Sequence, residues 1–324
     1  MLVWPFVFPF TPEQLGRASG LLASFVAPGG CNLRCPHCGI RQRGERNRPT
    51  NLGPEQFANF VSDLAEHEPL LAVAVVGDEP LIEGGWPYTL SVLRSARDAG
   101  VSRSLITNGT LLADRTDALA DVGLDSLFVS LDGVGKFHDQ TRGVEGAFEA
   151  AVRGLSAASS NPGLRDRIGI ASIIQARRLH YLRGMPELLE RHGVRRWLLS
   201  PVLTFGDEGR PPSCAGISDA EIGELVRLRQ DALARGIEVS VDGVFALDPS
   251  AADLAKRIIE ARLPIRRLGS TLSLTRLLPD GSCSVDPEIF GKVGPHTAKW
   301  DGVQAPHEFI RSIHPVAAGL VAAA

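Results

Sequence analysis

Few cysteines, no excess of positive charge and no long apolar run characterise this sequence, and each absence excludes a class of protein. Only five cysteines occur in 324 residues, which argues against a disulfide framework and makes a reducing cytoplasm the expected compartment. The formal net charge of -3 provides no basic field that would attract nucleic acid. Because no apolar run is long enough to span a bilayer, we expect no contact with a membrane.

Length and composition are those of a globular protein with a sizeable core. The 324 residues suit one large α/β barrel or two domains. A content of 44% hydrophobic and 22% charged residues is ordinary for such a protein. The N-terminus is apolar, but it lacks a basic leader and contains Pro5 and Pro9. We therefore predict that residues 1–19 form an extended arm packed on the body.

Short apolar runs alternate with helical patterns from residue 20 to residue 200. Strands are expected at residues 21–27, 71–76, 102–107, 126–131, 168–174 and 195–200, and helices at residues 53–67, 87–99, 111–122, 146–158 and 181–192. This alternation indicates a parallel sheet built from right-handed βαβ units. We predict an α/β fold in which residues 20–204 form a partial (β/α)6 TIM-like barrel.

The pattern changes after Pro201. Residues 206–217 are rich in glycine, proline and serine and predict a loop, which a helix at residues 219–235 and a strand at residues 237–241 follow. Further on, Pro279-Asp280-Gly281 separates two short apolar runs and predicts a hairpin. We expect residues 205–324 to form a small α+β extension that caps the substrate site.

The most informative feature is a cysteine triplet, Cys31, Cys35 and Cys38, in the run Cys-Asn-Leu-Arg-Cys-Pro-His-Cys. Three thiolates can hold three irons of a cubane cluster and leave the fourth iron open to a cofactor or substrate. The spacing differs from the two-plus-two pattern of structural zinc ribbons. A zinc knuckle with a histidine as fourth ligand is the alternative interpretation.

Unusual residues also follow the next three predicted strands. These are Gly77-Asp78-Glu79-Pro80 after the second strand, Thr107-Asn108-Gly109 after the third, and Ser130-Leu131-Asp132-Gly133 after the fourth, with His138-Asp139 and Arg142-Gly143 beyond. In TIM-like barrels, active sites form at the carboxyl ends of the strands. The strand endings therefore predict one shared site, although Asn108-Gly109 also suits a plain turn and His138-Asp139 suits helix capping.

Together these motifs resemble the radical S-adenosylmethionine (radical SAM) superfamily. The cysteine triplet matches that family's cluster motif in spacing, Gly77-Asp78-Glu79-Pro80 resembles its Gly-Gly-Glu-Pro motif, and residues 130–143 are similar to the branch with a SPASM or twitch extension. The resemblance implies a [4Fe-4S] cluster that reductively cleaves SAM to a 5′-deoxyadenosyl radical, which abstracts a hydrogen atom from the substrate. It also implies an external one-electron reductant such as flavodoxin or ferredoxin.

The resemblance assigns the triplet to the cluster and the strand-end residues to SAM. The SAM set comprises His37, Gly77, Asp78, Glu79, Pro80, Asn108, Ser130, Arg142 and Ile173. The backbone carbonyls of Gly77 and Asp78 would contact the SAM amino group, and Glu79 would either fix that loop or meet the ammonium. Ser130 and Arg142 would hold the carboxylate, since a guanidinium offers a forked pair of donors.

The nucleoside half of SAM has three expected contacts. Asn108 is placed to reach the ribose, and Ile173 could pack on adenine. The residue before the third cysteine is usually aromatic in the family, whereas here it is His37, whose imidazole can still lie against adenine. A second departure is Asp78, which replaces the second glycine of the family motif and adds a charge near the SAM ammonium.

Two cysteines lie outside the triplet. Cys283 falls in the predicted hairpin, which resembles the start of an auxiliary-cluster site in SPASM or twitch domains, but only Cys214 is left to join it. We therefore expect a degenerate extension without a second cluster. Either Cys283 or Cys214 could donate a hydrogen atom to a substrate radical, or Cys283 could be a small buried thiol.

The substrate expected from these features is a small polar metabolite, such as a sugar, nucleoside or amino-acid derivative. The missing auxiliary cysteines favour epimerisation, decarboxylation, elimination or rearrangement over a two-electron dehydrogenation. One alternative is a maturase or epimerase that acts on a ribosomal peptide. A non-enzymatic iron–sulfur or zinc protein is the competing class.

Overall fold

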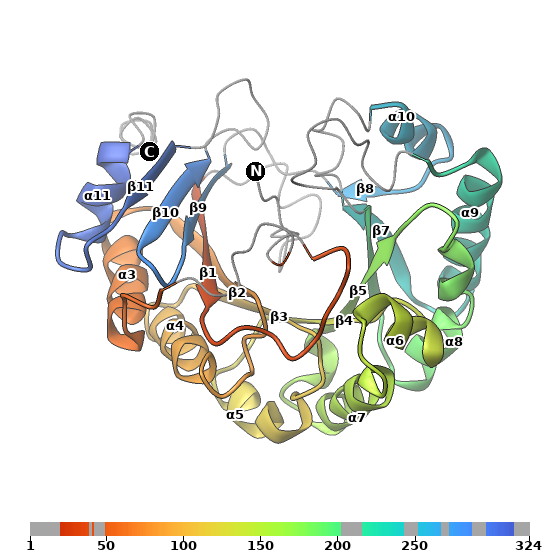
Figure 1. Ribbon diagram of the computed structural model, residues 1–324, viewed down its shortest axis with the longest axis horizontal. Coiled ribbons are helices and arrows are strands. Elements are labelled where there is room, and N and C mark those ends of the chain that lie inside the picture. Colours follow the sequence, from red (N-terminus) through yellow and green to blue (C-terminus); the bar gives the residue numbers. More distant parts are fainter. Residues whose placement is uncertain are drawn as a thin grey trace.

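The structure, a computed structural model, describes residues 20–38, 41, 49–201, 216–242, 252–266, 272–286 and 296–313. The predicted arm, residues 1–19, lies outside the described residues. The strands form one 11-stranded sheet in the order β11-β10-β9-β1-β2-β3-β4-β5-β6-β7-β8. The sheet curves into an open arc, and the helices cover its outer side (Figure 1).

The six predicted strands are present, and each pairs in parallel with the next along the chain. They are β1 (Gly20–Ala27), β2 (Leu70–Gly77), β3 (Ser102–Thr107), β4 (Ser126–Ser130), β5 (Ile168–Ile174) and β6 (Arg196–Pro201). The carboxyl ends of these strands therefore lie along one edge of the sheet, where the predicted site residues follow them.

Helices connect these strands on the outer side of the arc. They are α3 (Pro54–His67), α4 (Trp86–Asp98), α5 (Thr116–Asp121), α6 (Lys136–Arg142), α7 (Ala147–Ser160) and α8 (Met185–Arg191). Two predicted helices are shorter than expected, because a 3₁₀ turn forms their first part at Ala113–Arg115 and at Leu179–Leu182. The short helix α6 was not predicted and carries His138 and Arg142 toward the site.

The C-terminal part of the chain adds strands to both sides of this sheet, next to β6 and next to β1. Beyond helix α9 (Asp219–Ala234), the strands β7 (Glu238–Asp242) and β8 (Ile265–Arg266) extend it in parallel past β6, with α10 (Ala252–Glu260) between them. On the other side of the sheet, β9 (Leu272–Leu277) pairs in parallel with β1. The predicted hairpin is confirmed, since β10 (Ser282–Asp286) is antiparallel to β9 and is followed by β11 (His296–Lys299) and α11 (Pro306–Ile313).

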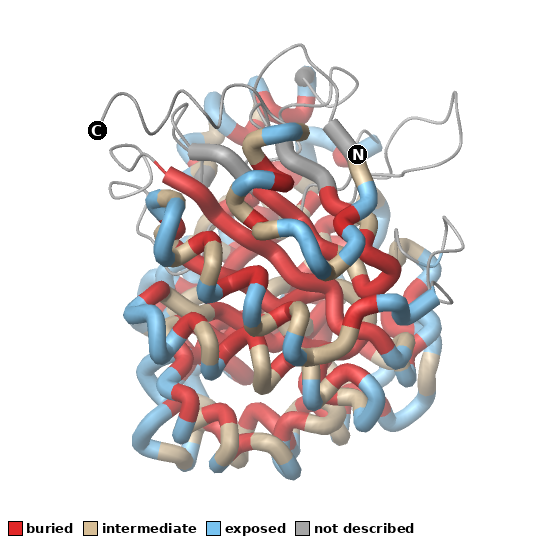
Figure 2. The backbone as a smooth tube through the Cα atoms, turned by 90° about the vertical axis from the view of Figure 1, so that its left-hand side faces the viewer, coloured by how far each residue is buried: buried red, intermediate tan, exposed pale blue. Residues whose placement is uncertain are grey.

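The core lies between the sheet and the helices (Figure 2). All eight residues of β1 are buried, as expected for a strand covered on both faces. Helix α3 buries Phe57, Phe60, Val61 and Leu64, which recur at the spacing of one helix face. Phe25 of β1 packs against Phe57 and Phe60, with ring centroids 5.7 and 5.9 Å apart. These contacts fix β1, and with it the start of the cysteine loop, against the helical layer.

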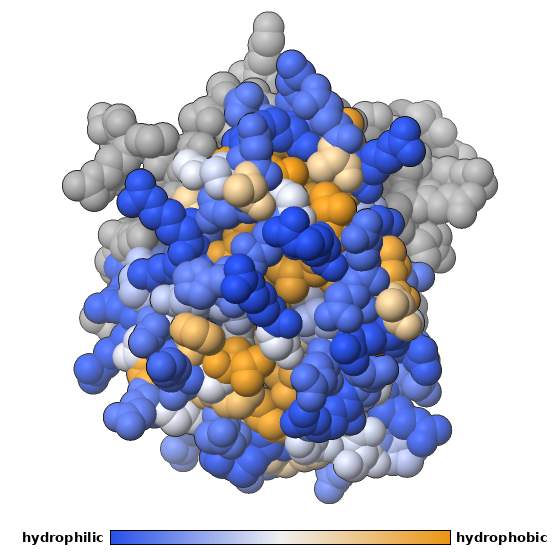
Figure 3. Space-filling model, turned by 90° about the vertical axis from the view of Figure 1, so that its right-hand side faces the viewer, coloured by the Kyte–Doolittle hydropathy of each residue, from blue (hydrophilic) through white to orange (hydrophobic). Residues whose placement is uncertain are grey.

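Hydrophilic residues cover much of the side of the molecule that carries α8 and α9, with separate hydrophobic patches between them (Figure 3). Ion pairs there join neighbouring elements, including Arg183 with Glu224 at 2.6 Å and Arg257 with Asp219 at 3.1 Å. Within the described residues, no helix combines the length and the apolar character that crossing a membrane requires.

Candidate cluster and cofactor site

The three cysteines of the triplet lie on the loop that follows β1, and none of them forms a disulfide. Cys35 is buried, and Cys31 and Cys38 pack with it in one small group that also contains Leu33. A turn closes the second half of the loop, because the amide of Cys38 donates to the carbonyl of Cys35 at 3.2 Å. The sequence therefore folds the three sulfur-bearing residues toward one another without a disulfide.

Backbone contacts hold this loop against the neighbouring strand ends. The amide of Glu79 donates to the carbonyl of Gly30, and the amide of Arg34 donates to the carbonyl of Arg142, both at 3.0 Å. Gly143 makes the second contact possible: it has a φ of +72°, and a Cβ there would lie 2.6 Å from the Arg34 carbonyl oxygen. The loops after β1, β2 and α6 are thereby joined.

Glu79 is fully buried and connects the loop after β2 with the loop after β3. Its Oε1 accepts from the Thr107 hydroxyl at 2.6 Å and from the Leu81 amide at 3.1 Å. Its Oε2 accepts from the Asn108 amide at 2.8 Å. Burial raises the pKa of Glu79 to about 7, although these three donors and Arg142 lower it. The carboxyl group thus fixes the loop, and its contact with a SAM ammonium stays a prediction.

This buried carboxyl group predicts a pH-dependent stability for the protein without bound cofactors. Because the pKa of Glu79 is raised from 4.5 to about 7, the folded protein holds more protons than the unfolded chain in that window. The contribution of Glu79 to stability therefore falls as the pH rises from about 4.5 to about 7, by something on the order of 3 kcal/mol, whereas the lowered pKa values of His37 and His138 act in the opposite direction. Thermal unfolding across this window should therefore show that the stability of wild type relative to Glu79→Gln declines as the pH rises, while the exposed control Glu149→Gln keeps the profile of wild type. The same pH profile in all three proteins would contradict this role of Glu79.

The Asn108 side chain is directed at the cysteine loop. Its Nδ2 donates to the Asn32 side chain at 2.8 Å and lies 3.7 Å from the Cys31 sulfur. Its Oδ1 accepts from the amide and the hydroxyl of Thr110. Asn108 therefore lies beside the cluster residues, and the ribose contact predicted for it is untested. Asn32 and Thr107 appeared in the sequence only as parts of quoted motifs and were assigned no role, because short polar residues in loops are common.

Asp132 holds Arg142 beside the triplet. In the sequence, Asp132 was noted only as part of the strand ending Ser130-Leu131-Asp132-Gly133. Nε of Arg142 lies 2.6 Å from Oδ2 of Asp132, whose side chain is 1% exposed. The other oxygen of Asp132 accepts from the Ile173 amide at 2.9 Å, and Nη1 of Arg142 lies 3.9 Å from the Cys35 sulfur. Burial lowers the pKa of Arg142, but Asp132 and Cys35 outweigh it and raise that pKa. The site thus contains a fixed cation.

Two histidines near Arg142 are neutral. Burial lowers the pKa of His138 to about 4, with a further contribution from Arg142, and its Nδ1 accepts from the Asp132 amide at 3.1 Å. Burial also lowers the pKa of His37 to about 3, again with help from Arg142. Asp139 caps the next helix, α7, because its carboxylate accepts from the amides of Gly146 and Phe148.

The remaining predicted residues lie at the ends of their strands. Ser130 ends β4 and pairs with Ala171 of β5, and Ile173 is half-buried near the end of β5. Gly77 has a φ of +101°, and a Cβ there would lie 2.5 Å from Val26. The Pro80 carbonyl accepts from the Thr89 hydroxyl at 2.7 Å, and Asp78 is half-buried between these residues. All of them border the same edge of the sheet, and their contacts with SAM remain predictions.

Comparison with known families shows what the region that carries this site is similar to. Residues 26–164 match the family model described as "Radical SAM superfamily". This region belongs to the radical SAM superfamily. The matched residues include the triplet, Glu79, Asn108, Asp132 and Arg142.

Curated relatives of this radical SAM region carry different names. The chain is 32% identical over 169 residues to Fe-coproporphyrin III synthase of Methanosarcina barkeri. The matched residues cover 51% of this chain and 40% of that protein. The chain is 28% identical over 177 residues to pre-heme d1 synthase of Dinoroseobacter shibae, covering 54% and 42%. The chain thus matches less than half the length of these relatives.

Solved structures confirm the predicted fold class, a TIM-like partial barrel. Streptococcus suis SuiB bound to S-adenosylmethionine has a TM-score of 0.64 at 13% identity, covering 93% of this chain and 68% of that chain. Native anSMEcpe with bound AdoMet has a TM-score of 0.61 at 16% identity, covering 88% and 79%. At such low identities the likeness concerns the fold alone.

The residues present fit the two cofactors of radical SAM proteins, a [4Fe-4S] cluster and SAM. Three thiols on one packed loop, none of them in a disulfide, offer a Cys₃ donor set, which would leave one iron of the cluster without a protein ligand. Burial raises the pKa of the Cys35 thiol, although Arg142 beside it opposes this rise, so thiolate formation is coupled to metal binding. The buried Arg142 cation suits the carboxylate of SAM.

Cys283 has the surroundings of a buried thiol. It is 1% exposed within the main core, and burial raises the pKa of its thiol to about 12. Its sulfur lies 3.5 Å from the Thr275 hydroxyl. A role as hydrogen-atom donor stays a prediction. Cys214, the other predicted donor, lies outside the described residues.

Proposed function

We propose that this protein is a radical SAM enzyme in which Cys31, Cys35 and Cys38 hold one [4Fe-4S] cluster. When bound and reduced, the cluster supplies the electron that cleaves SAM to a 5′-deoxyadenosyl radical, which abstracts a hydrogen atom from the substrate. A flavodoxin or ferredoxin is the proposed reductant. A reducing cytoplasm suits thiols that form no disulfide.

The observation that carries this proposal is the joining of the strand-end loops around the cysteine triplet. Nδ2 of Asn108 lies 3.7 Å from the Cys31 sulfur and Nη1 of Arg142 lies 3.9 Å from the Cys35 sulfur. Glu79 holds the loop that carries Asn108, and Asp132 pairs with Arg142 of α6. A zinc knuckle would need no buried cation beside its sulfurs. A site that binds the carboxylate of SAM next to a cluster does need one.

Each residue has a proposed task in this site. Arg142 and Ser130 hold the SAM carboxylate, and the carbonyls of Gly77 and Asp78 accept from its ammonium. Neutral His37 lies against adenine, since an uncharged imidazole loses less on leaving water than a charged one. Ile173 packs on the same ring system. Asn108 keeps Cys31 in place and contacts the ribose.

A small polar metabolite is the proposed substrate. The names of curated relatives support it, because they include Fe-coproporphyrin III synthase and a probable GTP 3′,8-cyclase from Methanocella arvoryzae, the latter 30% identical over 183 residues. Only two cysteines lie outside the triplet, too few for the usual auxiliary cluster. We therefore favour epimerisation, decarboxylation, elimination or rearrangement.

A ribosomal peptide is the second candidate substrate. One structure of similar fold is SuiB bound to its precursor peptide SuiA, with a TM-score of 0.59 at 12% identity. The two candidates differ in size. Turnover of a peptide but of no small metabolite would select the peptide.

Anaerobic reconstitution followed by reduction tests the proposed chemistry. The protein should bind about four irons per chain and release 5′-deoxyadenosine from SAM when dithionite is added. A Cys35→Ala variant should do neither, whereas Cys283→Ala should retain both. Purified protein that contains zinc and leaves SAM intact would support the non-enzymatic alternative instead.

A solvent-isotope experiment then tests whether a cysteine donates a hydrogen atom to the substrate radical. Product formed in D₂O from a candidate metabolite should carry one deuterium if a protein thiol returns a hydrogen atom, because thiols exchange with solvent. Loss of this label in Cys283→Ala or Cys214→Ala would identify the donor. An unlabelled product in wild type would exclude both cysteines from that role.

A further inference from the structure

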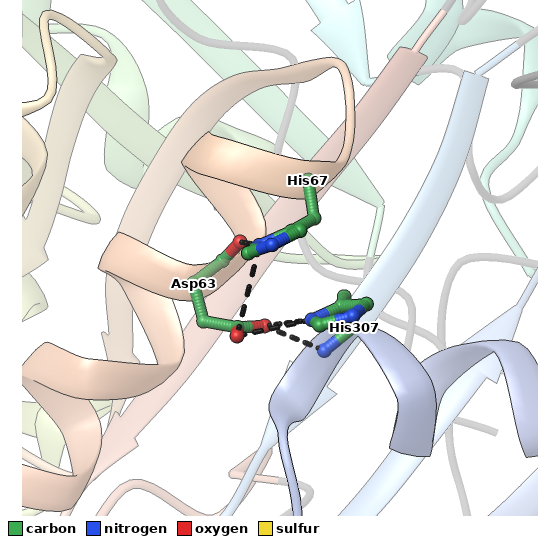
Figure 4. A group of neighbouring side chains, drawn as sticks. All are labelled: Asp63, His67 and His307. Carbon is green, nitrogen blue, oxygen red and sulfur yellow. Dashed lines mark hydrogen bonds and ion pairs between the residues drawn. The ribbon is translucent and has the colours of Figure 1, made fainter.

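A cluster of two histidines and one carboxylate lies on the outer side of the molecule, between α3 and α11. Asp63 and His67 are four residues apart on α3, so they face the same side of that helix. His307 comes from the first turn of α11. One possible ligand atom from each of the three residues lies within 4.8 Å of the others (Figure 4). This cluster is not used by the cofactor site.

We propose that Asp63, His67 and His307 bind a divalent transition-metal cation, with zinc the best match. Two imidazoles and one carboxylate form the N₂O set that zinc accepts, and water can complete a tetrahedral site. Such a cation would fasten α11, from the C-terminal part of the chain, to α3 of the radical SAM region.

Asp63 is already positioned for this task. Its Oδ2 accepts from the His307 amide at 2.6 Å, and Nδ1 of His307 lies 2.9 Å from the same oxygen. Both side chains are 15% exposed. Nearby, Nε of Arg311 donates to Glu68 at 2.8 Å and also joins α11 to α3. Two of the three ligands are therefore held in place before any metal arrives.

His67 is the adjustable ligand. Its ring stacks on that of His307, with centroids 3.9 Å apart and planes 10° apart. A metal lies in the plane of each imidazole that binds it, so two parallel rings cannot share one ion, and the His67 ring must turn. Its side chain is 39% exposed, so the rotation would break only the exposed contact of its Nδ1 with the Asp63 backbone carbonyl at 3.0 Å and the ring stack. The exposure also gives the ion a path of entry.

Binding of zinc to the cluster-loaded protein tests this proposal. Zinc is added after the iron–sulfur cluster has been reconstituted, so that the triplet is occupied, and the bound zinc is measured against a coloured chelator. One zinc per chain should be retained by wild type and by the control His192→Ala. His67→Ala should weaken zinc binding at least about tenfold, and zinc should raise the melting temperature of wild type and control but not of His67→Ala.

The exposed position of His67 keeps the test decisive, because its replacement leaves the buried contacts of α11 intact. Equal zinc binding by wild type and His67→Ala, or no binding by wild type, would overturn the proposal. Zinc that is lost only in Cys35→Ala would place the ion at the triplet and would also overturn it. The result does not depend on SAM cleavage, so this site and the proposed enzymatic activity fail or succeed separately.

Discussion

An Asp132→Asn variant should cleave SAM at least about tenfold more slowly than wild type while it keeps its cluster. The carboxylate of Asp132 is 1% exposed and neutralises Arg142 at 2.6 Å. Asparagine has no charge, so the buried guanidinium loses its counter-ion, a change that costs about 3–5 kcal/mol in buried pairs. The position of Arg142 beside Cys35 would then be lost, and SAM would bind more weakly.

Asp125→Asn is the matched control for this variant. Asp125 also accepts from a backbone amide, that of Arg103, at 2.9 Å and forms an ion pair with its guanidinium at 3.4 Å. It precedes β4, whereas Asp132 follows that strand, so it lies at the opposite edge of the sheet. We expect a higher KM for SAM in Asp132→Asn alone, with equal iron content in both variants. Equal KM values would refute the positioning role of Asp132.

Gly143→Ala should impair retention of the cluster. A Cβ at this position would lie 2.6 Å from the Arg34 carbonyl oxygen, and the backbone φ of +72° already disfavours a side chain. The left-handed conformation alone costs about 1–2 kcal/mol, and relief of the clash must move the cysteine loop away from Arg142. We expect the variant to lose more than half of its iron on gel filtration.

Gly146→Ala separates the effect of backbone strain from the effect of the clash with Arg34. Gly146 has a similar φ of +78°, but a Cβ there would meet no atom within 4 Å. This variant should lose about 1–2 kcal/mol of stability and keep its iron. Iron loss of the same size in both variants would show that backbone strain, and not the contact with Arg34, is responsible.

The local pattern of the sequence predicted the central part of the fold because each strand and helix there has its own signal. Short apolar runs marked β1 to β6, and the residues after β1 to β4 marked the edge of the sheet that carries the site. The pairing of β9 with β1 could not be predicted, because Gly20 and Leu272 are partners only through the tertiary fold. Strand β8, Ile265–Arg266, is too short to form a recognisable pattern.

The sequence predicted the residues whose chemical type alone indicates a function. It did not predict the residues that hold these functional side chains in position. Three cysteines at this spacing indicated a cluster by themselves. Asp132 did not stand out, since Asp-Gly is a common turn pair and its partner Arg142 lies one helix away. The Asp63, His67 and His307 group was invisible for a similar reason, because His307 is remote in sequence from α3.

An electron paramagnetic resonance spectrum of the reduced protein, recorded with and without SAM, tests the central claim most directly. If the triplet holds a [4Fe-4S] cluster with one open iron, reduction should give a cluster signal that SAM shifts. Cys35→Ala should give no such signal, and Asp132→Asn should need more SAM for the same shift. A cluster signal that SAM leaves unchanged, or a protein that binds zinc in place of iron, would contradict the account.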